Sequence, residues 1–257
     1  MTQAAVIIPA RYGASRFPGK PLALICGKPM IEHVYERAKR AHSASAVFVA
    51  TDNAKIYDTV VGFGGAAIMT KETHATGTDR IAEAARDLPF TVIVNVQGDE
   101  PLIEPDMIDS VIELMQDDRA SMGTLKKKIT TPCDIFDPNI VKVVTDSEGF
   151  ALYFSRSTIP YLRDVFDGKS TLDSMDAIDS SGIQYYKHIG IYGYKKEVLL
   201  RLSELPESEL EKAEKLEQLR ALTNGYGIKV GETSFDTIAV DRPEDIGKVE
   251  RWLNTYS

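Results

Sequence analysis

The sequence predicts an α/β fold in which a mainly parallel sheet carries helices on both faces. Short and almost continuous apolar segments at residues 5–8, 46–50 and 91–96 have the composition of strands that are buried on both sides. Amphipathic segments with helical spacing lie between them. An alternation of strands and helices along the chain is typical of a parallel sheet.

Two of the helices can be placed from the spacing of their apolar residues. One opens at Pro29, a residue suited to the first helical position, and carries an apolar stripe made of Met30, Ile31, Val34 and Ala38. Another begins at Asp106, with its stripe made of Met107, Ile108, Val111, Ile112 and Met115. We expect both helices to pack on the sheet.

The pattern changes after about residue 120. Segments 142–145, 151–154 and 188–195 read as strands, but turns and a polar loop at 164–181 separate them. We therefore expect one domain over residues 1–257, with an antiparallel excursion at about 122–196. A helical pattern returns at Ser208, where Ser208-Glu209-Leu210-Glu211 fits a capping box, and ends at Asn224-Gly225. A last helix is expected from Pro243 to Leu253.

The composition is that of an ordinary globular protein. With 257 residues, 43% of them hydrophobic and 26% charged, the chain can bury a core that needs no disulfide or structural metal. Cys26 and Cys133 lie far apart and form no CxxC motif, so we expect small core residues in a reducing compartment.

The N-terminal segment and the charge indicate where the protein works and what it binds. Pro9 and Arg11 interrupt the first apolar run too early for a signal peptide, and no segment has the ~20 apolar residues of a membrane span. We expect a cytoplasmic protein that does not enter a membrane. The formal net charge of -8 has the wrong sign for binding nucleic acid. An anionic small molecule would need a few well-placed cations or a bound metal.

The loop after the first strand, residues 10–21, is the first candidate site. It contains two glycines and three cations, namely Gly13, Gly19, Arg11, Arg16 and Lys20. At the carboxyl end of a parallel strand, such a loop can offer backbone N–H groups and positive charges to phosphates. It is not a Walker A loop, because five residues separate the glycines and Pro21 follows Lys20.

A second glycine-rich segment, Gly62-Phe63-Gly64-Gly65-Ala66-Ala67, matches GxGxxA only formally. It follows a helical pattern and precedes a short apolar run, the reverse of the order in a dinucleotide-binding motif. We interpret it as a turn that ends a helix.

Two acidic segments are candidates for binding a hard cation. Gln97-Gly98-Asp99-Glu100-Pro101 follows the third strand, where an acidic pair can meet a cation and phosphates; the alternative is a solvated turn. Val240-Asp241-Arg242-Pro243-Glu244-Asp245 follows another apolar run. Here the alternative is that Asp241 caps the last helix.

Polar residues along the later elements suggest a second ligand. On the strand 188–194, alternation places His188, Gly190, Tyr192 and Tyr194 on one face, which suits a polyhydroxylated or carboxylated ligand. A hydrogen-bonded structural histidine is the alternative. Ser155-Arg156-Ser157 interrupts another strand, and could simply end it in water.

Glu217 lies seven residues after Leu210, at the edge of the apolar arc of a continuous helix, and could point inward. Alternatively, Glu217 forms a surface ion pair with Arg220.

Taken together, these segments resemble the 3-deoxy-manno-octulosonate cytidylyltransferase (CMP-Kdo synthetase) family. The matching blocks in the first half are Ile7-Ile8-Pro9-Ala10-Arg11-Tyr12, Phe17-Pro18-Gly19-Lys20-Pro21-Leu22, Gly27-Lys28-Pro29-Met30-Ile31, Val49-Ala50-Thr51-Asp52, Thr76-Gly77-Thr78-Asp79-Arg80 and Val94-Asn95-Val96-Gln97-Gly98-Asp99-Glu100-Pro101. Those in the second half are Val141-Lys142-Val143-Val144, Ala151-Leu152-Tyr153-Phe154-Ser155-Arg156, His188-Ile189-Gly190-Ile191-Tyr192-Gly193-Tyr194, Leu216-Glu217-Gln218-Leu219-Arg220 and Val240-Asp241-Arg242-Pro243-Glu244-Asp245. They follow the family's order over nearly the whole chain.

The resemblance implies a nucleotidyltransferase, Rossmann-like fold and a Mg²⁺-dependent reaction. CMP would pass from CTP to the anomeric hydroxyl of the eight-carbon acid Kdo, with release of pyrophosphate, for lipopolysaccharide synthesis. It also implies a homodimer formed through the irregular middle region, which would contribute to the sugar site as well.

The resemblance further implies a role for each matching residue. Arg11, Ser15 and Lys20 would face the triphosphate, and Thr76, Gly77, Thr78, Arg80 and Gln97 would surround the cytidine. Asp99 and Asp241 would hold magnesium and, with Lys20, form the catalytic set. Arg156, His188, Tyr192, Glu217 and Gln218 would line the sugar pocket.

No general base is evident, so we expect metal activation of the attacking hydroxyl, with His188 orienting the sugar.

Two positions depart from the family pattern. Phe17 replaces a common Leu, and Arg242 places a cation beside a proposed metal ligand unless its side chain turns outward. Two alternatives remain open at this point: the same reaction on an 8-amino ulosonate or another nonulosonic acid, and a catalytically silent nucleotide-sugar sensor.

Overall fold

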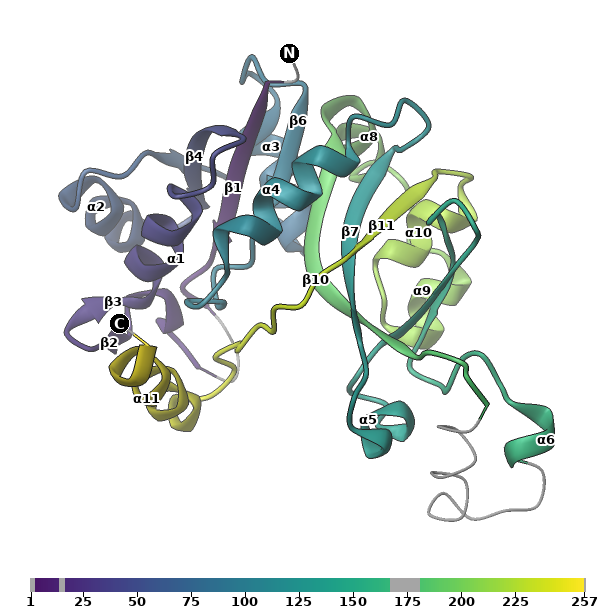
Figure 1. Cartoon of the computed structure of the whole chain (residues 1–257). Coiled ribbons are helices and arrows are strands. Elements are labelled where there is room, and N and C mark those ends of the chain that lie inside the picture. Colours follow the sequence, from purple (N-terminus) through teal and green to yellow (C-terminus); the bar gives the residue numbers. More distant parts are fainter. Residues whose placement is uncertain (1–2, 14–16, 167–180, 257) are drawn as a thin grey trace.

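A large twisted sheet forms the centre of the computed structural model, which describes residues 3–13, 17–166 and 181–256 (Figure 1). Along the sheet the strands follow the order β11 (Ile228–Glu232), β7 (Met122–Lys128), β10 (Tyr186–Lys195), β6 (Val92–Asn95), β1 (Ala4–Ala10), β4 (Ala44–Thr51) and β5 (Ala67–Met69). The three predicted apolar strands are β1, β4 and β6, and β1 pairs in parallel with both of the others. The predicted α/β class with a mainly parallel sheet is confirmed.

The antiparallel part of the fold lies partly inside this sheet. β10 runs antiparallel to both of its neighbours, β6 and β7, and also meets β8 (Lys142–Thr145). β8 pairs with β9 (Ala151–Ser155) in a further antiparallel ladder. Antiparallel pairing was expected here, but as an excursion outside the sheet. Because β10 is ten residues long, it pairs with β7 in both halves, while on its other side Tyr192–Lys195 pair with β6 and Lys187 pairs with β8.

Helices cover both faces, and each face has its own core. On one face, α1 (Met30–Ala38), α2 (Ala54–Gly62) and α4 (Pro105–Leu114) bury apolar side chains against the face of β1 that carries Val6 and Ile8. On the other face, α3 (Gly77–Ala85), α8 (Lys196–Leu202) and α10 (Gln218–Thr223) pack against Ile7 and Ile93. In Figure 1, α1 and α4 lie in front of the sheet and α3 lies behind it.

The ends of these helices follow the predicted signals. Pro29 is the N-cap of α1, one position before its predicted place. The glycine-rich turn after α2 is confirmed, since α2 ends at Gly62, Gly64 has a φ of 83° and β5 begins at Ala67. The N-terminus of α3 is fixed by a capping box between Thr76 and Asp79.

The helix predicted over 208–224 is two short helices, α9 (Glu209–Glu214) and α10. The capping box at Ser208 is confirmed, but Lys215 adopts a left-handed conformation (φ 54°) and ends α9. The break allows Arg220 to pair with Glu211 at 2.6 Å, with both side chains buried. In a continuous helix these residues would stand about 13 Å apart along the axis.

The C-terminal segment returns to the N-terminal half of the molecule. After β11 the chain passes through the 3₁₀ helix η2 (Pro243–Asp245) into α11 (Ile246–Tyr256), which confirms the predicted last helix. In Figure 1, α11 lies beside β2 (Leu24–Ile25) and β3 (Lys28–Pro29), which follow the 3₁₀ helix η1 (Lys20–Leu22). A separate apolar cluster holds them together, formed by Phe17, Ile25, Met30, Leu102, Val240 and Val249 with their neighbours.

A smaller lobe carries α5 (Pro132–Phe136) and α6 (Arg163–Phe166) around a cluster of Ile129, Ile135 and Tyr185. Most of the predicted polar loop at 164–181 falls in residues 167–180, outside the described residues. Cys26 and Cys133 are exposed free thiols, so the prediction that they are core residues was wrong. No helix among the described residues is long and apolar enough to cross a membrane.

A close approach at Gly98 gives a prediction for stability. A Cβ atom at this position would lie 2.7 Å from the carbonyl oxygen of Pro9 on the neighbouring β1, so the backbone would have to shift. We expect Gly98→Ala to lower the free energy of unfolding by about 1–3 kcal/mol, measured by urea denaturation. Gly62→Ala is the matched control, because its Cβ would meet nothing within 4 Å. Equal effects of the two variants would contradict this packing.

Candidate active site

The ammonium group of Lys20 lies where three distant segments of the chain meet. Its Nζ atom donates to Asp99 Oδ2 at 2.7 Å and to the carbonyl oxygen of Val240 at 2.8 Å. Asp241 Oδ1 lies 3.8 Å from the same nitrogen. The backbone N–H of Val240 also donates to the carbonyl of Asp99 at 2.9 Å. The two acidic segments singled out in the sequence are therefore brought together around one positive charge.

The fold explains why these segments meet. β1 and β6 are parallel neighbours, so the loops after Ala10 and Asn95 leave the same edge of the sheet. Burial of Val240 beside Ile25 and Met30 then fixes the returning segment against both loops. Asp241 does not cap the last helix, since the N-cap position of η2 is Arg242. Arg242 points outward with its side chain 64% exposed, facing Glu244, so its charge does not oppose a cation at Asp241.

The donor set fits a magnesium ion only together with phosphate. Among the described residues no group of three or more His, Cys, Asp or Glu side chains could hold a metal. Two carboxylates near one point are nevertheless a usual protein contribution for Mg²⁺, which takes its remaining oxygen ligands from water and substrate phosphates.

A basic cavity of about 220 Å³ opens beside Lys20. Its lining includes six of the residues predicted to bind nucleotide, namely Arg11, Lys20, Thr76, Gly77, Arg80 and Gln97, together with Asp99 and His74. The N-terminus of α3 supplies Gly77, and its positive dipole end favours anions. Three cations and a helix N-terminus make this cavity suited to a polyphosphate. Ser15, also predicted to face the triphosphate, lies outside the described residues.

Arg80 reaches this cavity from a fixed position. Its side chain is only 4% exposed, and Nη2 pairs with Asp52 at 2.5 Å, while Nη1 donates to the hydroxyl of Thr70. Asp52 follows β4, so the sheet and α3 are locked together by this ion pair. Its charge is already balanced by Asp52.

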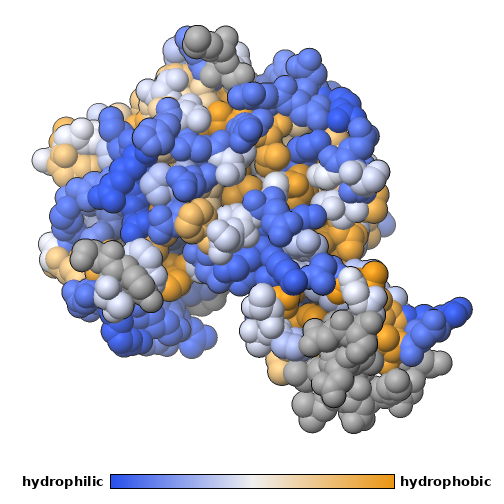
Figure 2. All heavy atoms as spheres, in the orientation of Figure 1, coloured by the Kyte–Doolittle hydropathy of each residue, from blue (hydrophilic) through white to orange (hydrophobic). Residues whose placement is uncertain are grey.

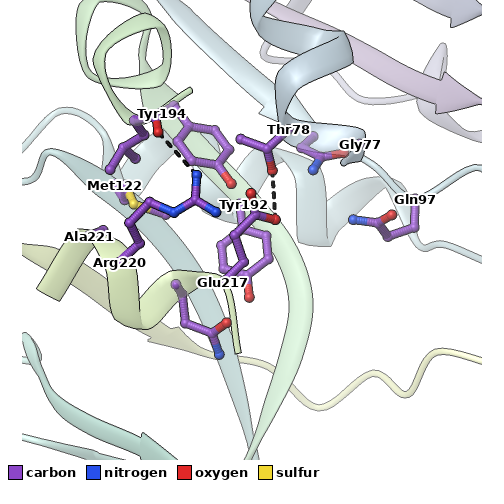
Figure 3. A pocket seen from close by; sticks show the side chains of 12 residues that line it. Gly77, Thr78, Gln97, Met122, Tyr192, Tyr194, Glu217, Arg220 and Ala221 are labelled. Atoms are coloured by element: carbon purple, nitrogen blue, oxygen red, sulfur yellow. Dashed lines mark hydrogen bonds between the residues drawn. The ribbon is translucent and has the colours of Figure 1, made fainter. Parts of the chain in front are cut away.

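A second cavity of about 140 Å³ adjoins the first, and both are lined by Gly77 and Gln97. Figure 3 shows its lining side chains, most of which come from α3, β7, β10, the segment around α10 and the loop after β6. Three of the residues predicted for the sugar, Tyr192, Glu217 and Gln218, lie here. Thr78, predicted for the nucleotide, lines this cavity and donates to Glu217 Oε2 at 3.0 Å. The structure thus places two cavities of different chemistry side by side.

Glu217 points inward, although the continuous helix used to predict this does not form. Burial raises the pKa of its carboxyl group above the ordinary value. The alternative of a surface pair with Arg220 is wrong, because the buried guanidinium of Arg220 pairs with Glu211.

His188, Tyr192 and Tyr194 share one face of β10, as predicted. The rings of His188 and Tyr192 are 5.3 Å apart, and those of Tyr192 and Tyr194 are 6.0 Å apart. His188 Nε2 lies 3.0 Å from the hydroxyl of Thr124, and the edge of the ring packs against Phe154. Burial lowers the pKa of His188 to about 3, so the ring is neutral at physiological pH. Hydrogen bonding of this histidine agrees with the structural alternative, and its role toward a sugar stays a prediction.

Arg156 is held by backbone carbonyl groups. Its Nε donates to the carbonyl of Glu214 at 2.7 Å and Nη1 to that of Pro138 at 2.9 Å. The neighbouring Lys142 is fully buried and donates to three carbonyls, those of Asp137, Ile140 and Arg156. Burial lowers the pKa of Lys142. Arg156 lines neither described cavity, but its partner Glu214 lies three residues before Glu217.

Sequence reasoning assigned no role to Asn95, Lys142 or Glu211. Asn95 lines the second cavity from the end of β6 and is 2% exposed. A polar residue inside an apolar strand segment was the available signal for both Asn95 and Lys142. Glu211 was identified as half of a capping box, but its pairing with Arg220 depends on the break at Lys215.

Comparison with known proteins gives one consistent result. A family model described as cytidylyltransferase matches residues 5–234. The 3-deoxy-manno-octulosonate cytidylyltransferase of Thermodesulfovibrio yellowstonii is 52% identical over 260 residues, covering 98% of each chain. That of Geobacter sulfurreducens is 53% identical over 245 residues, covering 95% of this chain and 96% of the relative.

A solved structure of similar fold is that of CMP:2-keto-3-deoxy-manno-octonic acid synthetase complexed with CTP. It superposes with a TM-score of 0.89 at 41% sequence identity and covers 100% of both chains. The likeness therefore extends over the whole fold, including the segments that form both cavities.

Glu100, next to Asp99, gives a prediction for the pH dependence of stability. Burial, aided by the charge of Asp99, raises the pKa of Glu100 to about 8. The folded chain then holds this proton more tightly than the unfolded chain, so the free energy of unfolding falls as the pH rises from about 4.5 to 8. We expect Glu100→Gln to remove part of this fall, on the order of a few kcal/mol, in urea denaturation at pH 5 to 9.

The exposed Glu113→Gln on α4 is the control, because it removes one carboxylate without changing a buried group. An unchanged pH profile in Glu100→Gln would show that Glu100 ionises normally in the folded chain.

Proposed function

The chain belongs to the 3-deoxy-manno-octulosonate cytidylyltransferase family, and on that premise we propose that it transfers CMP from CTP to the anomeric hydroxyl of Kdo, releasing pyrophosphate. One observation supports this most directly. Two cavities share Gly77 and Gln97, one of them basic and the other lined by tyrosine hydroxyls, a carboxyl group and side-chain amides. A transferase that joins a nucleotide to a sugar needs such a pair of adjoining sites.

In the reaction, the anomeric oxygen of the sugar attacks the α-phosphorus of CTP. The bond from the α-phosphorus to the bridging oxygen breaks, and pyrophosphate leaves with its electron pair. The hydroxyl proton passes to solvent or to the pyrophosphate, since no side chain at the shared wall is an evident base. Gly77 and Gln97 lie where the reacting groups of both substrates would have to meet.

Charge is the main obstacle, because CTP, a sugar carboxylate and an acidic protein repel one another. Two like charges ~4 Å apart cost on the order of 4 kcal/mol at an effective dielectric of ~20. In our proposal Arg11 and Lys20 neutralise the triphosphate, and Asp99 and Asp241 hold Mg²⁺ beside it. When bound, Mg²⁺ supplies Lewis acidity toward phosphoryl oxygens and lowers the pKa of a hydroxyl close to it.

Lys20 has a further part in this proposal. Without substrates its ammonium keeps the Asp99 and Asp241 carboxylates together, as the distances of 2.7 and 3.8 Å indicate. Phosphates in the basic cavity compete for the ammonium, because Lys20 also lines that cavity. Nucleotide binding therefore frees the carboxylates for the metal.

Arg156 is the group that we propose for the sugar carboxylate. A guanidinium can bind a carboxylate through two parallel hydrogen bonds. The contact with Glu214 anchors it to the segment that carries Glu217 and Gln218. His188, neutral and packed against Tyr192, would orient the sugar through that ring.

We further propose that the chain works as a cytoplasmic homodimer. The exposed free thiols of Cys26 and Cys133 suit a reducing compartment. On the lobe that carries α5 and α6, Tyr161 is 63% and Ile183 43% exposed. Figure 2 shows apolar surface on this lobe. Exposed apolar side chains gathered on one lobe are typical of protein interfaces.

The substrate prediction is tested by measuring pyrophosphate release with the four nucleoside triphosphates against Kdo, 8-amino-Kdo and other nonulosonic acids, with and without Mg²⁺. We expect turnover with CTP and Kdo, and its loss without the ion. Asp99→Asn and Asp241→Asn should each lower kcat by roughly 10² or more. Greater activity with an 8-amino or other nonulosonic acid would establish the alternative acceptor, and no release with any pair would favour a silent sensor.

The dimer prediction is tested by sedimentation velocity. We expect the wild-type chain to sediment as a dimer and Tyr161→Asp to shift toward the monomer, because a buried unpaired charge opposes association. Leu24→Asp is the control, since Leu24 is 60% exposed on the separate β2–β3 hairpin. A wild-type monomer would contradict the proposal.

A further inference from the structure

Three buried polar atoms without a hydrogen-bond partner among the described residues belong to side chains that line the second cavity. They are Asn95 Oδ1, Glu217 Oε1 and Gln218 Nε2. Buried polar atoms in folded proteins are nearly always hydrogen bonded, because each unpaired group costs free energy. A cluster of three around one cavity indicates a ligand whose polar groups complete them.

Asn95 is buried at the wall of this cavity. It is 2% exposed and lies beside the phenol of Tyr194. Its Oδ1 atom has no hydrogen-bond partner among the described residues, whereas its amide nitrogen is a donor that suits the tyrosine oxygen. Burial raises the pKa of Tyr194 well above its ordinary value, so the phenol stays neutral and the arrangement persists over the physiological pH range. The amide oxygen is thereby left for the ligand.

Glu217 is oriented by a hydrogen bond. Its Oε2 atom accepts from the hydroxyl of Thr78, which leaves Oε1 unpaired (Figure 3). Asn95 and Glu217 come from separate elements, the end of β6 and the residue before α10. Two independent acceptors, Asn95 Oδ1 and Glu217 Oε1, and one donor, the Gln218 amide nitrogen, are thus available to a ligand in the cavity.

We propose that Asn95 is a specificity-determining residue that accepts a hydrogen bond from a hydroxyl group of the sugar acceptor. This inference rests on the proposed function and adds a residue that recognises one hydroxyl group of the substrate. A hydroxyl can donate to Asn95 or Glu217 and accept from Gln218, so a polyol can satisfy all three atoms. A volume of about 140 Å³ is similar to a cavity that holds benzene, and so accommodates part of a sugar.

The test compares the wild-type chain with Asn95→Ala, using Kdo and a set of analogues that each lack one hydroxyl. We expect Asn95→Ala to lower kcat/KM for Kdo about 3- to 10-fold, as for a lost neutral hydrogen bond, with KM for CTP unchanged. With the wild-type chain, one analogue should have a kcat/KM that is lower than that of Kdo by a similar factor. With Asn95→Ala, the same analogue and Kdo should have equal kcat/KM. That lack of additivity identifies the hydroxyl that Asn95 accepts from.

The measurements of the analogues with the wild-type chain do not depend on the folding of any variant. They therefore remain valid even if Asn95→Ala is unstable. In that event Asn95→Ser supplies the comparison. The exposed Asn254→Ala on α11 is the matched control and should behave like the wild-type chain. A rise in KM for CTP alone would show that the cavity holds the cytosine base, and additive losses for every analogue would likewise overturn the inference. Absence of turnover with wild-type protein and Kdo would instead reject the proposed function.

Discussion

The position of the Lys20 ammonium between Asp99 and Asp241 is the constraint on which the rest of the site depends. Parallel pairing of β1 with β6 brings the first two segments to the same edge of the sheet. The third arrives only because the chain crosses back after β11 and buries Val240 in the cluster beside α11. A charge that joins three distant segments makes the geometry of the Asp99 and Asp241 carboxylates a property of the whole fold.

The two cavities use burial in opposite ways. In the basic cavity, cations and the N-terminus of α3 face an opening where phosphates can replace water. In the second cavity, burial keeps Tyr192 and Tyr194 neutral, raises the pKa of Glu217 and leaves polar atoms unpaired. Such a wall favours hydroxyl groups over a second polyphosphate. The shared residues Gly77 and Gln97 mark the boundary between an ionic and a hydrogen-bonding environment.

Much of this could be predicted from local sequence patterns. The buried strands, the capping box at Ser208 and the turn at Gly64 depend on neighbouring residues, and all are confirmed. The placement of β10 inside the sheet and the break at Lys215 could not be predicted, because each depends on a partner far along the chain. The Arg220–Glu211 pair and the role of Lys142 as a buried donor to three carbonyls have the same origin. The prediction that Glu217 points inward is confirmed, although the continuous helix on which it was based does not form.

The central claim is that Lys20 and a divalent cation compete for one pair of carboxylates. Binding of Mn²⁺, followed by electron paramagnetic resonance with and without CTP, tests it most directly. We predict weak binding to the wild-type chain alone, stronger binding with CTP, and roughly tenfold tighter nucleotide-free binding to Lys20→Met, a gain that Asp241→Asn removes. Mn²⁺ binding by Lys20→Met that is no tighter than that of the wild-type chain would contradict the account.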